Sequence, residues 1–329
     1  MTESNRRTAV VAIGGNSLIK DTEHQSVRDQ YIAAKETCHH IVGMIRDGWN
    51  VVITHGNGPQ VGFVLRRSEL AATELHEVPL DVCGADTQGA IGYALQQNLC
   101  NEFRRLGMDR NTATVICQTE VLADDPAFAN PSKPIGTFMD EEMAERRRQQ
   151  GWNLIEDSNR GWRRVVASPT PVRIVEMPAI RALVDAGVVV ITAGGGGIPV
   201  VADAKGDLQG SSAVIDKDLA SALLATELGA DLLLISTAVE QVYLDFGRPE
   251  QRAVASLTAS ETRRYLEEGT HFARGSMAPK ILAVLNYLEK GGKEAIVTDP
   301  ANVERALHGE TGTRFVSDDT PEPANDRPS

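Results

Sequence analysis

The sequence predicts an α/β fold in which an open, mostly parallel sheet lies between two layers of helices. A short apolar strand runs into a glycine loop three times, at residues 8–16, 50–58 and 188–197, and helical stretches follow. This alternation is typical of parallel sheets covered on both faces. Aromatic residues make up only 5% of the chain, while alanine, valine, leucine and glycine are plentiful, which favours such a sheet over a sandwich of antiparallel strands.

Length, charge and cysteine usage limit the class of protein. With 329 residues the chain can bury a substantial core. The net charge of −12, with no basic run longer than Arg146–Arg148, argues against nucleic acid or an anionic membrane as a partner. Residues 1–7 show no leader pattern and no segment approaches a membrane span, so we expect a cytoplasmic protein. Without CxxC spacing, we expect reduced, structural thiols at Cys38, Cys83, Cys100 and Cys117.

The first half of the chain contains two of the strand and glycine-loop units. Its predicted elements are a strand at 8–13, a helix at 27–45, a strand at 50–55, helices at 60–75 and 81–106, and a strand at 113–122. The helix at 81–106 has a face of glycine and alanine that includes Gly84, Gly89 and Gly92. We expect this face to be buried against a neighbouring helix or a second chain.

Residues 123–166 lose the regular pattern, and we expect them to form an inserted subdomain. Asn130–Gly136 is rich in turn residues, and a proline on each side of Ser132 and Lys133 stiffens the backbone and presents the lysine outward. A charged helix is predicted at 140–150. A loop lysine is usually only solvated, so Lys133 needs support from other residues.

The second half of the chain contains the third glycine loop. Its predicted elements are a helix at 174–186, a strand at 188–193, a helix from 217, a strand at 231–236, helices at 258–268 and from 277, a strand at 294–299, a helix at 303–308 and a disordered tail from 317. The loop Gly194–Gly197 lets backbone N–H groups approach an anion, although four glycines could also form a flexible linker. The preceding strand and Pro199 favour the anion site.

We place the chemistry at Asp216, Lys217 and Asp218, where one cation lies between two carboxylates. Asp216 suits a helix N-cap, because apolar residues recur at helical spacing from Leu219 onward. Such a helix start attracts phosphate, and a lysine in its first turn can follow the charge of a transferring phosphoryl group. A capped helix on the surface, with no role in binding, would have the same sequence pattern. Lys280, at the start of another helix, also favours a bound anion.

These segments are expected to converge on one crevice, because ligands bind at the carboxyl ends of parallel strands. The chain contains neither G-x-x-x-x-G-K-[ST] nor G-x-G-x-x-G, so a P-loop enzyme and a dinucleotide dehydrogenase are not supported. It also lacks H-E-x-x-H, G-x-S-x-G and zinc-site spacing. The sequence therefore predicts a phosphate site built without the usual motifs.

Six motifs, in order, resemble those of carbamate kinases, which have the amino acid kinase fold. They are 12–16 (AIGGN), 54–62 (THGNGPQVG), 79–84 (PLDVCG), 124–136 (DDPAFANPSKPIG), 213–219 (AVIDKDL) and 275–280 (GSMAPK). The resemblance implies one domain over 8–316, with a protruding lid subdomain at about 123–166 and flexible termini at 1–7 and 317–329. It also implies a homodimeric kinase for the reaction ATP + carbamate = ADP + carbamoyl phosphate, with Mg²⁺ bound through the nucleotide phosphates. Such an enzyme would form ATP in nitrogen catabolism, for example arginine catabolism.

The resemblance further implies roles for individual residues. The catalytic residues would be Lys133, Lys217, Asp218 and Lys280. The carbamate and phosphate would be held by Gly14, Gly15, Asn16, Gly56, Asn57, Gly58, Gly195 and Gly196, and the nucleotide by Thr237, Tyr243, Met277 and Ala278. Carbamate is already an anionic nucleophile, so phosphoryl transfer needs positioning and charge neutralisation rather than a general base, and His55 is expected to be structural.

The sequence departs from the family pattern at three positions expected near the nucleotide. The family usually has glycine where this chain has Ala278, aspartate at Ala238 and glutamate at Ser212. Two alternatives therefore remain: a kinase of the same fold that acts on another small carboxylate or carbamate-like acid, and a non-catalytic nucleotide or metabolite sensor. The intact segment 130–136 and the three lysines favour a carbamate kinase.

Overall fold

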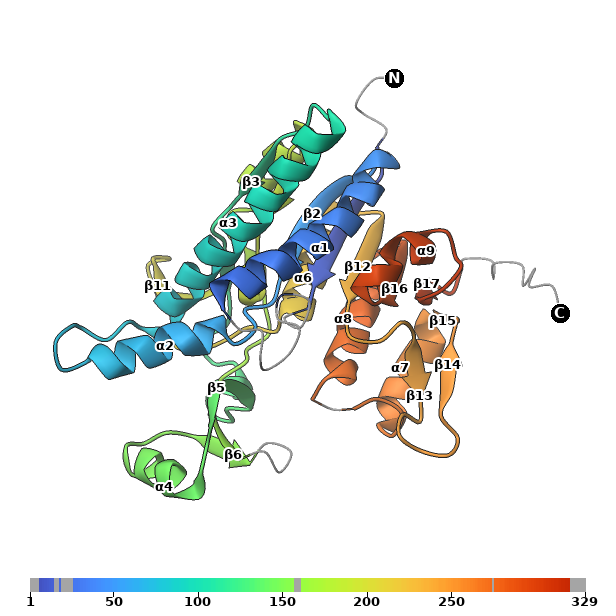
Figure 1. The fold of residues 1–329 in the computed structure, drawn as a ribbon. Coiled ribbons are helices and arrows are strands. Elements are labelled where there is room, and N and C mark those ends of the chain that lie inside the picture. Colours follow the sequence, from blue (N-terminus) through green and yellow to red (C-terminus); the bar gives the residue numbers. More distant parts are fainter. Residues whose placement is uncertain (1–5, 15–17, 19–25, 157–160, 274, 320–329) are drawn as a thin grey trace.

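An eight-stranded, mostly parallel sheet forms the centre of the protein (Figure 1). The computed structural model describes residues 6–14, 18, 26–156, 161–273 and 275–319. In spatial order the strands are β15 (Ser256–Thr258), β17 (Thr313–Val316), β16 (Glu294–Thr298), β12 (Leu232–Ser236), β1 (Thr8–Ile13), β2 (Asn50–His55), β9 (Val189–Ile191) and β3 (Thr112–Thr114). Within the described chain, neighbouring strands run parallel except β16 and β17.

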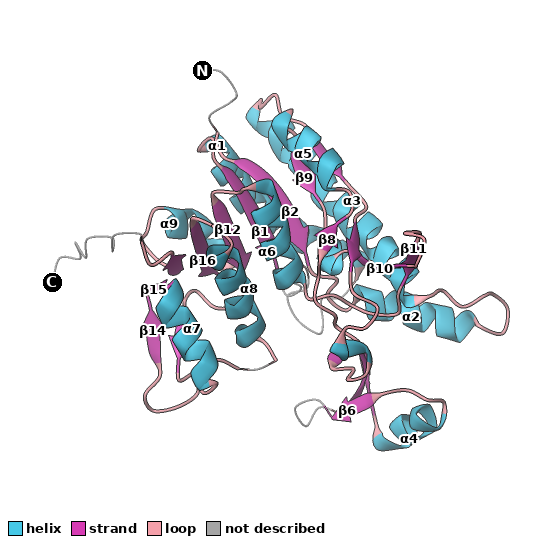
Figure 2. Ribbon diagram, turned by 180° about the vertical axis from the view of Figure 1, so that it is seen from behind, coloured by secondary structure: helices cyan, strands magenta, loops and turns pink. Residues whose placement is uncertain are grey.

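Helices cover both faces of this sheet (Figure 2). Successive residues of a strand point to opposite faces. Accordingly, Ala9, Val11 and Ile13 lie in one apolar core with residues of α1, α3 and α9. Val10 and Ala12 lie in a second core with α5, α6 and α8. The predicted three-layer α/β architecture is thus confirmed.

The helices are α1 (Val27–Arg46), α2 (Gln60–Ala71), α3 (Leu80–Leu106), α4 (Glu141–Gln149), α5 (Met177–Asp185), α6 (Lys217–Leu228), α7 (Ala259–Glu268), α8 (Met277–Glu289) and α9 (Val303–Leu307).

Three small sheets surround the central one. A four-stranded sheet has the order β11 (Leu208–Gly210), β10 (Ile198–Ala202), β4 (Gln118–Glu120) and β8 (Arg173–Ile174). A two-stranded sheet pairs β13 (Val242–Leu244) with β14 (Arg252–Val254). The third has the order β5 (Lys133–Met139), β7 (Trp162–Val166) and β6 (Leu154–Glu156). Together with α4, the third sheet protrudes from the rest of the molecule (Figure 1), and we call this unit the lid.

The continuous strand predicted over 113–122 is wrong. The structure has β3 and β4 there, and they belong to different sheets. Between them the side chain of Gln88, from α3, takes the place of a neighbouring strand. Its Oε1 accepts the N–H of Cys117 at 2.8 Å, and its Nε2 donates to the Cys117 carbonyl at 3.0 Å. Side-chain hydrogen bonds of this kind satisfy buried backbone N–H and C=O groups that have no neighbouring strand to pair with.

The expectation that the small face of α3 is buried holds only in part. Gly92 is buried against Thr114, where a Cβ atom would lie 2.3 Å from Cγ2 of the threonine. Gly89 and Ala90, however, are exposed in the single chain. Tyr93 on the same helix is 63% exposed. This part of α3 is therefore a surface of the isolated chain.

Two further sequence expectations can be compared with the described residues. Burial raises the pKa of the Cys83 thiol to about 11 and that of Cys117 to about 12, which makes both poor nucleophiles. Among the helices that the structure describes, none is long and apolar enough to span a membrane. Most of the tail predicted to be disordered, from residue 320 onward, lies outside the described residues.

Candidate active site

A cleft of about 1170 Å³ opens at the carboxyl ends of the central strands. Gly14 follows β1, Gly56 follows β2 and Thr237 follows β12, and all three line the cleft. Residues 132–136 and the starts of α6 and α8 complete its walls. The cleft therefore lies where ligands bind in open parallel sheets.

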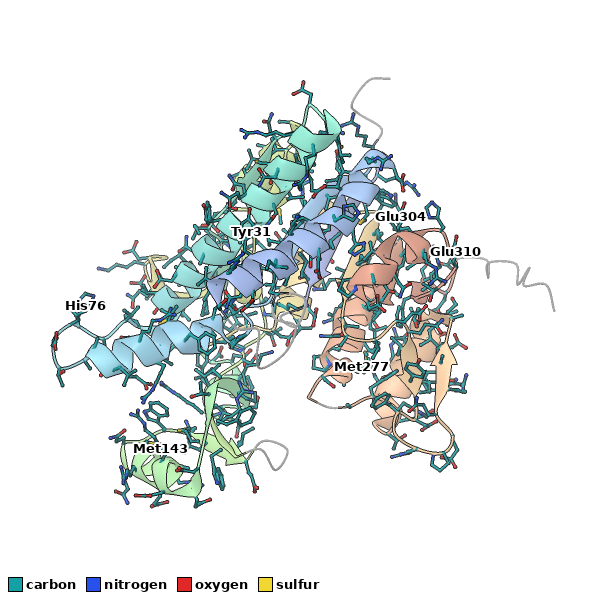
Figure 3. The ribbon with its side chains drawn as sticks, in the orientation of Figure 1. Tyr31, His76, Met143, Met277, Glu304 and Glu310 are labelled. Carbon is teal, nitrogen blue, oxygen red and sulfur yellow. The ribbon has the colours of Figure 1, made fainter. Side chains whose placement is uncertain are left out.

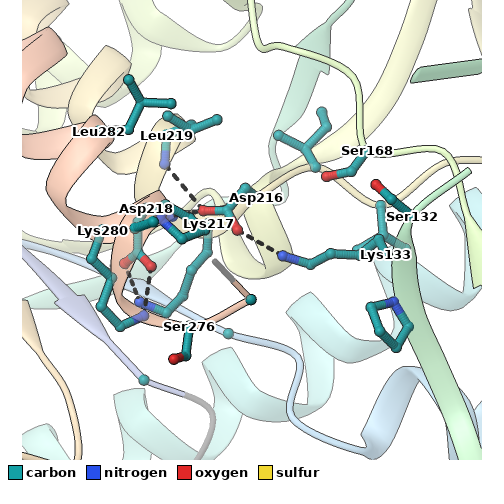
Figure 4. Close-up of a pocket in the computed structure, with 18 of the residues that line it drawn as sticks. Ser132, Lys133, Ser168, Asp216, Lys217, Asp218, Leu219, Ser276, Lys280 and Leu282 are labelled. Atoms are coloured by element: carbon teal, nitrogen blue, oxygen red, sulfur yellow. Dashed lines mark hydrogen bonds and ion pairs between the residues drawn. The ribbon is translucent and has the colours of Figure 1, made fainter. Parts of the chain in front are cut away.

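Asp216 fixes the start of α6. Its backbone is extended, and its Oδ1 accepts the N–H groups of Asp218 at 2.9 Å and Leu219 at 3.4 Å, as an N-cap residue does. Its second oxygen, Oδ2, lies 2.6 Å from Nζ of Lys133, which comes from the lid (Figure 4). Asp216 thus caps α6 with one oxygen and pairs with Lys133 through the other, and the ion pair brings the lid lysine to the start of α6.

Asp218 holds the other two lysines. Its Oδ1 lies 2.5 Å from Nζ of Lys217 and its Oδ2 lies 2.8 Å from Nζ of Lys280, so each carboxylate oxygen accepts from one ammonium group (Figure 4). Lys217 lies in the first turn of α6 and Lys280 in the first turn of α8. Both helices point their positive ends at this cluster, where a bound anion is stabilised.

The burial of this cluster shifts its protonation equilibria. Burial alone would raise the pKa of the Asp218 carboxyl, but Lys217 and Lys280 outweigh this effect and lower the pKa to about 2. The pKa of Lys217 is lowered, chiefly because burial disfavours the ammonium form. Together with Lys133 and Asp216, the cluster contains three cations and two carboxylates. It therefore has one positive charge that an anionic ligand can neutralise.

The glycine loop after β9 packs closely against two side chains at the end of β2. A Cβ atom on Gly194 would lie 2.3 Å from Cε1 of His55, and one on Gly195 would lie 2.2 Å from Nδ2 of Asn57. Asn57 is held in turn by Thr87, whose Oγ1 donates to its Oδ1 at 3.0 Å. Two of the four glycines are thus required by the packing of this loop against the cleft, which sequence spacing alone does not reveal.

His55 is buried behind this loop. Its Nδ1 lies 3.1 Å from the carbonyl oxygen of Gly56. Burial lowers its pKa to about 4, so the imidazole is neutral at pH 7. This geometry agrees with the structural role expected for His55.

The structure brings most of the predicted site residues to the cleft. Those that line it are Lys133, Lys217, Asp218, Lys280, Gly14, Gly56, Asn57, Gly58, Gly195, Thr237 and Ala278. Three others do not line it. Gly196 is buried, and a Cβ atom there would lie 2.6 Å from the Ile215 carbonyl oxygen. Tyr243 lies in β13 with its ring 6.2 Å from that of Phe246, and Met277 packs on the apolar core. The remaining two, Gly15 and Asn16, lie outside the described residues.

Several lining residues were not predicted. Arg163 comes from the lid, and Arg263 and Glu267 come from α7, which the sequence predicted only as a helix. Ser132 and Ser276 lie within the motifs at 124–136 and 275–280. Their place near Lys133 and Lys280 in those motifs is the one sequence feature that could have indicated them. Of the three departures from the family pattern, Ala238 and Ala278 line the cleft. Ser212 is exposed and does not, so its expected place near the nucleotide is not supported.

Comparisons with known proteins show the family of the chain. The model of the amino acid kinase family matches residues 7–299. The chain is similar to the carbamate kinase-like protein YahI of Escherichia coli strain K12, with 50% identity over 315 residues, 94% of this chain and 99% of that protein. It is 44% identical to the carbamate kinase of Thermococcus kodakarensis over 94% of this chain and 99% of that protein. Among solved structures, the carbamate kinase from Giardia lamblia bound to AMP-PNP has a TM-score of 0.89 and 39% identity, covering 96% of this chain and 100% of that one.

Proposed function

The chain belongs to the amino acid kinase family, and from this premise we propose that it is a carbamate kinase that transfers a phosphoryl group reversibly between ATP and carbamate. The observation that carries the proposal is the cluster of Lys217, Asp218 and Lys280 in the cleft, with Lys133 brought to it by Asp216. Relatives named carbamate kinases, 41–45% identical over more than nine-tenths of this chain, support the choice of acceptor.

The reaction needs no proton transfer. In the ATP-forming direction an oxygen of the β-phosphate of ADP attacks phosphorus, and the bond from phosphorus to the carbamate oxygen breaks. Carbamate leaves as an anion, and in the reverse direction it attacks the γ-phosphorus of ATP while ADP leaves. Charge on the transferring group is the main quantity to stabilise, and preorganised cations do so efficiently.

We assign Lys217 and Lys280 to the transferring phosphoryl group and Lys133 to the carbamate side. Lys217 and Lys280 share one carboxylate, so their ammonium groups are already side by side before substrate binds. Lys133 Nζ is less buried than they are, with 34% of its side chain exposed, and it comes from the lid. Asp218 is a positioning residue for both buried lysines. Gly14, Gly56 and Asn57 would place the acceptor in line.

We assign the nucleotide to the part of the cleft that Thr237 and Ala278 line. Arg263 from α7 also lines the cleft and adds a cation. Tyr243 and Met277 lie outside the lining, so we assign them no direct contact with nucleotide. The ligand is expected to be ATP or ADP, and the match to a structure bound to AMP-PNP supports this.

Mg²⁺ is expected to arrive with the nucleotide and to be bound through its phosphates. The described residues include no group of three or more histidine, cysteine, aspartate or glutamate side chains placed to hold a metal ion. The Asp216 and Asp218 carboxylates are already paired with lysines. When bound, Mg²⁺ would neutralise the phosphates, which usually supply several of its ligands themselves.

The remaining parts of the proposal concern the setting of the enzyme. We propose that the lid, about 123–166, closes over the carbamate and carries Lys133 with it. We propose a homodimer that uses the exposed face of α3, where Val82 and Tyr93 are 43% and 63% exposed. A cytoplasmic enzyme that forms ATP in nitrogen catabolism, such as arginine catabolism, would use the reaction in the direction of carbamoyl phosphate breakdown.

A direct assay tests the function. Purified protein is incubated with ADP, Mg²⁺ and carbamoyl phosphate, and ATP is followed with a coupled luminescence reaction. ATP well above the uncatalysed background is expected, and its absence would overturn the proposal. A panel of small carboxylic acids with ATP, followed by release of ADP, separates a kinase for another acid. ATP binding without transfer to any acid would indicate a sensor.

A further inference from the structure

A second pocket lies between α2 and the lid, outside the cleft described above. Its volume is about 230 Å³. We call it the lid pocket, and its functional groups come from Arg66, Glu69, Arg147, Trp152 and Arg164. Its lining residues come from α2, β5, α4 and β7 and from Trp152, and Met143 of α4, which also lines it, is labelled in Figure 3.

Cations outnumber carboxylates in the lid pocket. Glu69 Oε2 lies 3.1 Å from Nη1 of Arg66 and 3.2 Å from Nη2 of Arg147, so one carboxylate serves two guanidinium groups. Asp140 also lines the pocket, but its Oδ1 already accepts a backbone N–H at 2.8 Å as the N-cap of α4. Counting Arg164, three cations face two carboxylates. The side chains that line the pocket therefore carry a net charge of +1.

Arg164 is the cation that lacks a carboxylate partner among the residues that the structure describes. Its guanidinium lies over the ring of Trp152, 4.4 Å from the ring centroid, and Arg147 lies 4.3 Å from the same ring. Burial lowers the pKa of Arg164, yet a guanidinium remains charged at any physiological pH. Stacking uses the face of the guanidinium and leaves its N–H groups available for hydrogen bonds. The aromatic ring thus holds a donor group in place.

We propose that the lid pocket binds a small monocarboxylate with an apolar body. A carboxylate can pair with Arg164 through two parallel hydrogen bonds, and its single charge balances the net +1. The apolar body would contact Met143 and Phe138, which line the same pocket. The volume lies below the range of about 300–1,000 Å³ that drug-sized ligands need, so the ligand is small. An inorganic dianion would leave the apolar wall unused and exceed the available charge.

The lid pocket shares a strand with the main cleft. Ile135 and Gly136 of β5 line both cavities, and Lys133 at the start of β5 pairs with Asp216 in the cleft. A ligand in the lid pocket would therefore act on the strand that positions Lys133. This consequence, unlike the binding itself, rests on the proposed kinase function.

Binding is tested with 4-fluorobenzoate as the probe, followed by ¹⁹F NMR on the full chain without nucleotide. We expect saturable binding that weakens about 10-fold or more in Arg164→Gln, the usual scale for losing a hydrogen bond to a charged group. Lys217→Ala, which removes a cation of the main cleft, should bind the probe as the unaltered chain does. Inorganic sulfate at the same concentration should not displace the probe.

Three outcomes would overturn the site: no saturable binding, binding that survives Arg164→Gln, or binding lost in Lys217→Ala. Displacement by equimolar sulfate would overturn the monocarboxylate assignment. Arg164→Gln could disturb the lid, so Arg66→Gln is a second variant. The Arg66 side chain is 42% exposed, and weaker probe binding with an unchanged Tm is expected.

The coupling to the main cleft is tested by kinetics. Saturating probe should change the KM for carbamoyl phosphate in the unaltered chain and not in Arg164→Gln. An unchanged KM would overturn the coupling, whereas the NMR result does not depend on activity.

Discussion

Nζ of Lys280 lies 2.8 Å from Oδ2 of Asp218, and this contact joins the start of α8 to the start of α6. The other oxygen of the same carboxylate accepts from Lys217 at 2.5 Å. Without the carboxylate, two neighbouring ammonium groups in a buried site would repel each other. Asp218 therefore holds two like charges side by side before any substrate is present.

Replacing Lys217 by alanine should lower kcat by at least about 100-fold, the scale on which one preorganised charge stabiliser contributes. The lysine is buried beside Asp218 and lines the cleft, so alanine removes its charge and leaves the carboxylate with one ammonium partner instead of two. The measurement is ATP formation from ADP and carbamoyl phosphate. Lys205→Ala, which removes an exposed lysine from the turn between β10 and β11, is the matched control and should retain full activity. Retained turnover in a folded Lys217→Ala protein would remove this residue from the mechanism.

Asp218 should also make stability depend on pH in acid. Its pKa is about 2 in the folded protein against 3.8 ordinarily, so the unfolded chain binds more protons between these values. The carboxylate therefore stabilises the fold fully above about pH 4, and this contribution is lost as the pH falls through about 2. With 2% of the residue exposed, the shift corresponds to about 2 kcal/mol.

Urea unfolding of the unaltered chain and of Asp218→Asn at a series of pH values measures this contribution. The difference in unfolding free energy between the two should shrink by about 2 kcal/mol between about pH 5 and pH 2. Asp185→Asn, at the exposed end of α5, is the control for the loss of one carboxylate charge. A difference independent of pH would mean that the lysines do not stabilise the Asp218 carboxylate.

The sequence predicted the strands and helices whose local residue pattern directly reflects how they are buried in the fold. The strands at 8–13 and 50–55 were predicted with the bounds of β1 and β2, because their apolar runs are buried on both faces and end at glycine. Asp216 was predicted as an N-cap, because the helical period of α6 starts directly after it. Short strands such as β11 and β13 were missed, since three residues carry too little period to detect.

What the sequence could not provide was the pairing of distant residues. Nothing local indicates that Lys133 reaches Asp216, 83 positions away, or that Gln88 replaces a strand beside Cys117. Both contacts depend on how separate elements pack. The same holds for the lid pocket, whose cations come from α2, α4 and β7. Motif reasoning therefore identified the lysines of the main cleft but gave no sign of the second cavity.

Gly62 is predicted to set the position of the lid strand. A Cβ atom there would lie 2.5 Å from Cα of Gly136, and backbone cannot yield as a flexible side chain can. Gly62→Ala should separate α2 from β5, reduce the unfolding free energy by about 1–3 kcal/mol as overpacking does, and raise the KM for carbamoyl phosphate by displacing Lys133. Steady-state kinetics and urea unfolding provide both measurements.

Gly43→Ala is the matched control for this variant. Gly43 also lies within a helix, α1, but a Cβ atom there would meet its nearest neighbour, the Glu304 carboxyl, at an ordinary 3.7 Å. Alanine is the better helix former by roughly 0.5–1 kcal/mol, so this variant should be as active as the unaltered chain and slightly more stable. Unchanged KM and stability in Gly62→Ala would show that the lid strand is not set by this contact.

The ATP-forming reaction should show no titration by a histidine. Burial lowers the pKa of His55 to about 4, so its imidazole stays neutral across the neutral range, and the carbamate leaving group needs no acid. We expect kcat to change less than about 2-fold between about pH 5.5 and 7.5, the range in which an ordinary histidine loses most of its protons. If a step near pH 6.5 were observed and disappeared in His55→Gln but not in His308→Gln, at the surface end of α9, His55 would be a catalytic group and its structural assignment wrong.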